Sequence, residues 1–279
     1  MQSIDEKELK KRFYWRAFIR IPYKIITILK YLLSFFSFIK VEKYNIERIR
    51  NKHDSETVFI FGSGPSIDTY PQNFLDGKIS IALQLAFMKY PNATYIHITE
   101  ADRLEWFITN YPEFFNTPGL YCDPLFPIVT LNSALKNVNI KSPPYYLKYN
   151  PKRLNINNIE KEVKAALSGN IFRYHSNSTC LHTAIWCALI LGFKTIELIG
   201  CDFSSKSGQH YSKDTNVKDS RKRSNEFLDN AYYKMNIFTN DIINISRKYG
   251  ITINRYHDYT DYKNLSQNRL NNPVSKQIK

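Results

Sequence analysis

The sequence predicts an α/β protein in which helices cover both faces of a mostly parallel sheet. Short apolar runs alternate along the chain with segments of helical pattern, and the strongest run ends in a glycine-rich turn. A long apolar helix that is followed by glycine and a further apolar run is typical of the same architecture. With 279 residues the chain can bury a core, in one large domain or in one domain plus a lid.

The first strong element is VFIFGSGPSID, residues 58–68. Its apolar beginning predicts a buried strand that ends directly in Gly62. Gly62 and Gly64 allow the backbone to turn sharply and to come close to a ligand. A short helix is expected to begin near Pro65, because the fixed φ of proline suits a first helical turn.

We expect the N–H groups of Ser63, Gly64 and Ser66 to point at an anion, as they do where open α/β sheets hold a nucleotide at the carboxyl end of a strand. An ordinary strand-to-helix turn is the alternative. Ile67 stands where a dinucleotide fingerprint has its third glycine. No G-K-[ST] follows, which argues against a P-loop.

The rest of the chain continues the alternation of strands and helices. Further strands are expected at residues 79–85, 95–99, 120–122, 196–199 and 251–253. Helices are expected from Asp102 through Phe107, over residues 180–191 and over residues 226–249, with Gly192 and Gly250 ending the last two. Residues 140–165 are rich in proline and asparagine, which predicts an irregular surface excursion or lid.

Residues 1–50 are expected to form a basic, amphipathic region that associates with a membrane. They carry 12 Lys/Arg against 5 Asp/Glu, a charge of +7, which is half of the chain's +14. A helix would bring four of the basic residues close to one face: Arg12, Arg16, Arg20 and Lys24. Lys30 interrupts the apolar stretch that follows, so a helix among anionic headgroups fits better than a bilayer span. Packing on the core or on a partner subunit is the alternative.

Two further regions complete the predicted organisation. Residues 51–263 form the α/β domain, with its lid around residues 204–225, and residues 264–279 form a polar tail. The four cysteines show no C-x-x-C spacing and no ladder of histidine partners: Cys122, Cys180, Cys187 and Cys201. Reduced thiols in a cytoplasmic protein, and no metal site, are therefore expected.

Three segments are expected to meet at the carboxyl edge of the sheet: the turn at 62–66, the helix start at 178–180 and the loop at 202–211. The helix start offers N–H groups and hydroxyls to a phosphate or carboxylate, with plain helix capping as the alternative. Asp202, which follows Gly200, is expected either to hold a ribose hydroxyl or to cap the next turn.

The chemistry-bearing candidates lie on or near the loops of this edge. His210 suits deprotonation of an alcohol near neutral pH. Tyr211 can donate a hydrogen bond to a departing phosphate oxygen. Glu100 and Asp102 form an acid-x-acid pair after the third strand, a spacing found in metal-dependent sugar transferases, although Asp102 can also cap the following helix. Of His175 and His182, we expect one to face the site and the other to be packed in a helix.

These motifs, in this order, resemble a known enzyme family. The turn VFIFGSGPSID, the S-T-C helix start and LGFKTIELIGCDF with a trailing G-x-H-Y resemble bacterial sialyltransferases of glycosyltransferase family 42 and their motility-accessory and pterin pyrophosphokinase-like relatives. The resemblance covers roughly residues 57–255. It implies a Rossmann-like, GT-A-variant-like single nucleotide-binding domain that needs no cofactor or metal beyond a CMP-activated sugar as co-substrate.

The resemblance also implies roles for individual positions. Asp202 would sit behind the donor, and Tyr211 matches a lid tyrosine. By position, the residues that would contact the nucleotide are Gly62, Ser63, Gly64, Thr179 and Cys180. The full set of residues expected to bind it adds their neighbours on the same segments and at the end of the second strand: Ser66, Gln84, Ser178, Gly200 and Asp202.

The chain departs from the family pattern at several of these positions. Ser63 stands where the family has asparagine in the turn, and Leu83-Gln84 stands where it has asparagine at the end of the second strand. Asn177 stands where the family has arginine, and Ser204 stands where it has the first lid tyrosine. The family's catalytic histidine falls near Asn236. We therefore expect His210 to be the base, with Glu100 or Asp102 behind it.

The function expected is transfer of an acidic keto-sugar, sialic acid or Kdo-like, from CMP to a hydroxyl of a glycan or glycolipid. The enzyme would act in polysaccharide biosynthesis on the inner face of the bacterial inner membrane, bound peripherally to its anionic surface. A nucleotide-dependent diphosphokinase-like enzyme and a non-enzymatic basic protein that binds nucleic acid are the alternatives. The oligomeric state stays open, with a homo-oligomer among the options.

Overall fold

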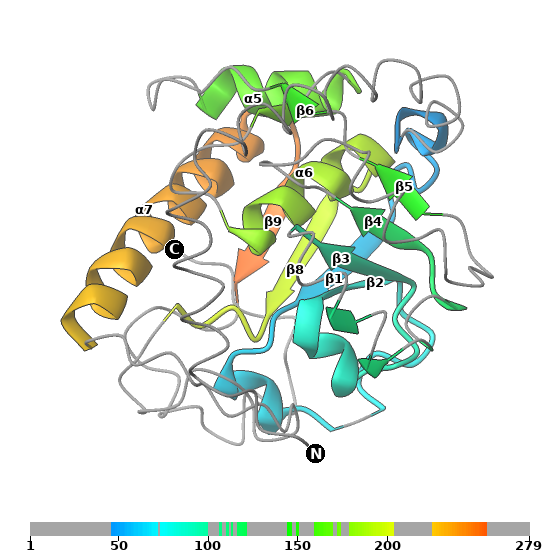
Figure 1. The fold of residues 1–279 in the computed structure, drawn as a ribbon. Coiled ribbons are helices and arrows are strands. Elements are labelled where there is room, and N and C mark those ends of the chain that lie inside the picture. The colour runs from blue at the N-terminus through cyan, green and yellow to red at the C-terminus, as the bar shows by residue number, and fades with distance from the viewer. Residues whose placement is uncertain are drawn as a thin grey trace, which may run out of the picture.

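The fold is an open, parallel α/β sheet, as the sequence predicts. The computed structural model describes residues 46–71, 73–99, 106–107, 110–111, 113, 116–121, 144–146, 149–150, 159–169, 172–173, 179–203 and 225–255. Within them, seven strands pair in the order β5-β4-β3-β2-β1-β8-β9, and every pairing is parallel (Figure 1).

The strands of this sheet are β1 (Thr57–Phe61), β2 (Ser80–Leu83), β3 (Tyr95–Ile98), β4 (Gly119–Tyr121), β5 (Pro144–Tyr146), β8 (Thr195–Ile199) and β9 (Thr252–Arg255). Two short strands, β6 (Tyr149–Asn150) and β7 (Phe172–Arg173), pair with each other. The described helices are α5 (Ile159–Leu167), α6 (Cys180–Leu191) and α7 (Asn225–Arg247). Short 3-10 helices are η2 (Ile46–Ile49), η3 (Pro65–Thr69) and η4 (Gln84–Met88).

Each face of the sheet has its own hydrophobic core. Val58 and Ile60 of β1 pack with α5, α6 and α7 on one face. Phe59 and Phe61 point to the other face, where they pack with residues of η3 and η4. Apolar side chains on both faces explain why β1 reads as a continuous apolar run instead of an alternating one.

The helix α6 is the central helix of the larger core. It begins at the N-cap Thr179 and ends at Gly192, whose φ of 95° is in the left-handed region, as predicted. The N–H groups of Asn51, His53 and Ser55 donate to the carbonyls of Ile190, Leu191 and Gly192. The segment before β1 thus satisfies carbonyls that a helix end otherwise leaves unpaired.

Two expectations about the middle of the chain are corrected. The second strand ends at Leu83 instead of residue 85, because Gln84 takes a φ of +48° and starts η4. Residues 140–165 are not wholly irregular, since they include β5 and most of α5. Val163 and Ala166 of α5 are buried in the core beside α6 and α7, and this tertiary packing was invisible in the sequence.

Several predicted regions lie outside the described residues. They are residues 1–45 of the membrane-associating region predicted over 1–50, residues 204–224 of the lid predicted around 204–225, and the tail at residues 264–279. In the part of the chain that the structure describes, none of the helices is long and apolar enough to cross a bilayer.

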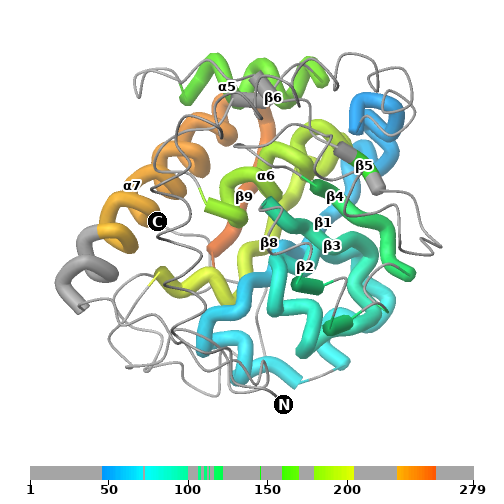
Figure 2. Tube along the Cα trace, viewed as in Figure 1, coloured from blue at the N-terminus to red at the C-terminus, as the bar shows by residue number. Residues whose placement is uncertain are grey.

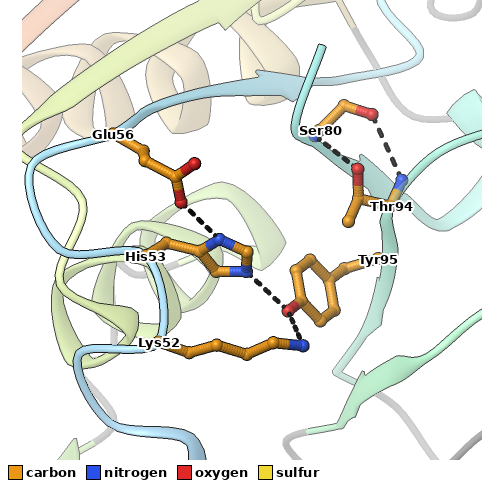
Figure 3. Close-up of polar contacts among 6 residues, drawn as sticks. All are labelled: Lys52, His53, Glu56, Ser80, Thr94 and Tyr95. Atoms are coloured by element: carbon orange, nitrogen blue, oxygen red, sulfur yellow. Dashed lines mark hydrogen bonds and ion pairs between the residues drawn. The ribbon is translucent and has the colours of Figure 1, made fainter. Parts of the chain in front are cut away.

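A polar cluster ties the amino ends of β1 and β3 together, at the edge opposite the strand ends predicted to bind ligand (Figure 3). Nδ1 of His53 lies 2.7 Å from the Glu56 carboxylate, and Nε2 lies 2.8 Å from the Tyr95 hydroxyl. Lys52 Nζ donates to the same hydroxyl at 3.3 Å. The His53 ring also stacks on Phe193, with 4.8 Å between centroids. The cluster therefore joins the segment before β1 to β3 and to the end of α6.

The Tyr95→Phe substitution tests this cluster. We expect a loss of about 1 kcal/mol in unfolding free energy at pH 7, because the buried hydroxyl bonds both His53 and Lys52. Burial raises the pKa of Tyr95, so the native state favours the neutral phenol. That contribution is complete below the unfolded pKa near 10 and is lost as the pH rises through the folded pKa.

Urea unfolding of wild type and Tyr95→Phe between pH 7 and pH 11 measures both effects. The variant should lose less stability at alkaline pH than the wild type. Tyr233→Phe, at a side chain that is 55% exposed, is the control. An equal alkaline loss in Tyr95→Phe and wild type would show that this phenol does not couple to folding.

Candidate functional site

The order of the strands places a topological switch point between β1 and β8. From β1 the chain builds the sheet outward through β2, β3, β4 and β5, and after α6 it returns to pair β8 on the opposite side of β1. Open α/β sheets bind ligands outside the carboxyl ends of the strands at such a point. The chain segments that leave β1 and β8 turn at the same end of the sheet (Figure 2).

The loops after β1 and β8 are interlocked at this point. Gly62 N–H donates to Ile199 O at 2.8 Å, and Gly64 N–H donates to Gly200 O at 2.9 Å. A Cβ on Gly62 would lie 2.5 Å from Gly200 O, and one on Gly64 would lie 2.5 Å from Asp202 Oδ2. The two glycines of the turn are thus required for contact with the neighbouring loop, whatever ligand they also approach.

Asp202 fastens the two loops to each other. Its side chain is 3% exposed, and Oδ2 accepts the Ser66 N–H at 2.8 Å while Oδ1 accepts the Ser66 hydroxyl. Burial raises the pKa of Asp202, and the two Ser66 donors oppose that rise. The carboxylate thus acts on the turn after β1, and the turn that follows it in sequence lies outside the described residues.

This arrangement corrects the expected role of two N–H groups. Those of Gly64 and Ser66 do not face an anion, because Gly200 O and Asp202 accept them inside the protein. Ser63 is half-buried, and its N–H has no acceptor within the described part of the chain. Ser63 is therefore the residue of the turn best placed to donate to a ligand.

At the start of α6 the structure shows helix capping. Thr179 Oγ1 accepts from Leu181 N–H at 3.2 Å, and Thr179 N–H donates to Nδ1 of His182 at 2.9 Å. Cys180 Sγ lies 3.8 Å from the carbonyl of His97 in β3, so the helix begins beside the carboxyl end of that strand. Because the Leu181 N–H donates to the capping side chain, fewer N–H groups of the helix start remain free to bind a phosphate.

The start of α6 also meets the loop after β8. The rings of His182 and Phe203 lie 6.1 Å apart at an interplanar angle of 22°. The loop at residues 200–203 thus contacts the glycine turn on one side and the capped helix on the other, and the described parts of the three predicted segments converge.

Two residues at this edge adopt backbone conformations that are rare for their type. Gln84, directly after β2, has a φ of 48°, and Phe203, four residues after the end of β8, has a φ of 46°. Positive φ costs a non-glycine residue free energy and persists where the surroundings hold it, often at functional sites. Both positions follow strands that flank β1.

None of the three described histidines is available as a base at this edge. His97 is fully buried, and burial lowers its pKa to about 4. Its Nδ1 donates to Leu120 O at 2.8 Å, and Nε2 lies 2.5 Å from Thr183 Oγ1. His182 is also fully buried, and His53 belongs to the cluster at the opposite edge. The expectation that one of His175 and His182 is a packed helix residue agrees with His182.

Five candidate site residues lie outside the described part of the chain: Glu100, Asp102, Ser178, His210 and Tyr211. Within the described part, no group of three or more His, Cys, Asp or Glu side chains is arranged to hold a metal ion.

The sequence interpretation missed Arg255, which lies at the carboxyl end of β9. Its side chain is 5% exposed and contacts Asn236 of α7 and the loop after β8. The signal that the sequence offered was a basic residue two positions after the strand predicted at residues 251–253.

Comparisons with known protein families and with curated proteins find no match to this chain. Among solved structures the chain is similar to the sialyltransferase CstII from Campylobacter jejuni, in complex with a substrate analogue, cytidine-5'-monophosphate. The match has 14% sequence identity and a TM-score of 0.39, and it covers 73% of this chain and 81% of that chain. A likeness of this extent assigns neither a substrate nor a reaction to the chain.

Gly64→Ala tests the interlocked loops. We expect a loss of at least about 2 kcal/mol in unfolding free energy, because the new Cβ would overlap the buried Asp202 carboxylate and the Gly200 carbonyl. Gly77→Ala is the comparison, since Gly77 has a φ of 70° but open space around it, and it should cost only about 1 kcal/mol. Chemical denaturation measures both, and an equal cost in the two variants would contradict the close contact.

Proposed function

We propose that the protein is a glycosyltransferase that moves an acidic keto-sugar from a CMP donor to a hydroxyl of a glycan or glycolipid acceptor. The observation that carries this proposal is the pair of glycine loops at the β1/β8 switch point, where this type of sheet binds nucleotides. Hydrogen bonds join the two loops: the Ile199 and Gly200 carbonyls and the Asp202 carboxylate accept N–H groups of the turn after β1.

The contacts at this edge suggest how a nucleotide would be held. The Ser63 N–H supplies a donor, while Thr179 and Cys180, both half-buried, lie at the start of α6 near the end of β3. Gln84 follows the neighbouring strand β2 and adds an amide group. Asp202 is buried and bonded to Ser66, so its role is to fix the turn that binds the ligand.

The choice of CMP and of an acidic sugar rests on the sequence pattern that surrounds these loops. The turn, the capped helix and the L-G-F–strand–G-C-D-F unit resemble the corresponding motifs of family 42 sialyltransferases. A CMP-activated acidic sugar carries negative charge on both its phosphate and its carboxylate. The net charge of +14 suits such an anionic donor, because a positive surface attracts it.

The reaction that we propose is a displacement at the anomeric carbon. A base takes the proton of the acceptor hydroxyl, the oxygen attacks the anomeric carbon, and the bond to the CMP phosphate breaks. We assign the base to His210, because it directly precedes Tyr211 in the segment that follows β8. The three described histidines are buried or lie at the other edge. Tyr211 would donate a hydrogen bond to the departing phosphate, and the basic residues within 1–50 would hold the enzyme on an anionic membrane.

A thermal-shift panel with CMP, UDP, GDP and ATP, with and without EDTA, tests the proposal. CMP should raise the melting temperature in a concentration-dependent way, and EDTA should not abolish that rise. A response to ATP that EDTA removes would favour the diphosphokinase alternative instead. Absence of any nucleotide response, together with tight, salt-sensitive DNA binding, would favour a nucleic-acid-binding protein.

His210→Ala tests the assigned base. Turnover with a CMP-sugar donor should fall about 100-fold or more while the CMP-induced thermal shift is retained, since general base catalysis contributes on that order. His53→Ala, at the opposite edge of the sheet, is the matched histidine control. Near-wild-type turnover in His210→Ala would remove His210 from this role.

A further inference from the structure

A buried arginine lies beside the candidate site, and no part of the proposed reaction uses it. Arg255 ends β9, which pairs with β8 through the register Leu198 to Arg255. Its side chain is only 5% exposed, whereas arginine is almost never buried unless it is paired or hydrogen-bonded. The burial of this charge calls for a partner.

The contacts of Arg255 join three elements. Nη1 donates to Asn236 Oδ1 on α7, and Nη2 donates to Cys201 O in the loop after β8 at 3.4 Å. The guanidinium carbon lies 5.4 Å from the centroid of the Phe203 ring, within the range of a cation–π contact. The guanidinium thus holds both residues that flank Asp202 in the loop.

Phe203 needs such support. Its φ of 46° places a bulky residue in the left-handed region, which is costly unless the surroundings hold it. Its ring contacts His182 on α6 as well as Arg255, at 6.1 Å and 5.4 Å between centres. Arg255 therefore helps to keep the backbone after Asp202 in this conformation.

The charge of Arg255 acts on Asp202 as well. Within the described residues, four neighbours face this carboxyl: Ser66 and Asp68 from η3, Cys201 from its own loop and Arg255 from β9. Burial raises the pKa of Asp202, the Ser66 donors and Arg255 lower it, and Asp68 raises it. Burial raises the pKa of Cys201 to about 12, so that thiol is neutral at physiological pH.

We propose that Arg255 is a positioning residue of the nucleotide site: it anchors Cys201 and Phe203 and balances the charge of Asp202, so that Asp202 holds the turn at Ser66. This inference rests on the proposed function for the identity of the ligand. It assigns Arg255 no contact with the nucleotide.

The variants Arg255→Met and Arg255→Lys test the proposal, with Arg48→Met as control, since Arg48 is an exposed arginine on η2. The first measurement is urea unfolding of the ligand-free protein from pH 4 to pH 8. A raised carboxyl pKa contributes stability that is complete below the unfolded pKa and is lost as the pH rises through the folded pKa. Removing Arg255 raises that folded pKa further, so the loss becomes larger at high pH.

The difference in unfolding free energy between wild type and Arg255→Met should therefore grow from pH 4 to pH 8. It should not grow when both proteins also carry Asp202→Asn, which retains hydrogen-bonding atoms without the charge. Arg255→Lys should show the same pH dependence of unfolding free energy as the wild type, because lysine keeps the positive charge. A difference that is constant with pH would overturn the coupling to Asp202, whether or not the protein binds CMP.

The second measurement is calorimetric titration with CMP at pH 5 and pH 8. Arg255→Met should weaken CMP binding about tenfold at pH 8 and less at pH 5, with partial rescue in Arg255→Lys and no change in Arg48→Met. Because the CMP phosphate itself titrates at about pH 6, the same titrations are made with wild type and Arg255→Met both carrying Asp202→Asn. A loss that is equal at both pH values, or a pH dependence that persists in the Asp202→Asn background, would overturn a positioning role through Asp202. Absence of CMP binding by the wild type would refute the proposed function, and the unfolding data would still decide the charge coupling.

Discussion

The bond between the Asp202 carboxylate and Ser66 is the constraint on which the rest of the site depends. It joins residues that are 136 positions apart in sequence, and it closes the gap between the loops after β1 and β8. Gly62 and Gly64 make the bond geometrically feasible, because side chains at those positions would meet Gly200 or Asp202. A buried carboxyl without these donors would be costly, so the turn and the loop stabilise each other.

A second set of contacts ties this edge to the helical face of the sheet. His182 accepts the Thr179 N–H at Nδ1, so its neutral ring donates from Nε2 to Thr239 Oγ1 at 2.8 Å, and that hydroxyl donates to Met235 O at 2.8 Å. The start of α6 is thereby fixed to α7 by a chain of bonds in which each donor has an acceptor. The Phe203 ring stacks on the same histidine. The loop after β8 is therefore held by the start of α6 on one side and by the turn after β1 on the other.

The sequence predicted the elements whose signals are local. The apolar run of β1, the limits of α6 and its glycine cap could be read directly, because capping and turn chemistry depend on neighbouring residues. The helix α5 was missed because its burial depends on contacts with α6 and α7. The sequence also predicted that Asp202 lies at the carboxyl edge of the sheet. It did not reveal that Asp202 binds Ser66 or that Arg255 lies nearby, because these contacts arise only when strands distant in sequence are paired.

A crystal structure of the protein with CMP at saturating concentration tests most directly whether the interlocked loops form a nucleotide site. We expect the cytidylate at the carboxyl ends of β1 and β8, with a phosphate or ribose oxygen accepting the Ser63 N–H and with the Asp202–Ser66 bonds intact. Cytidylate bound at another edge of the sheet, or the Asp202–Ser66 bonds broken to admit it, would contradict the account.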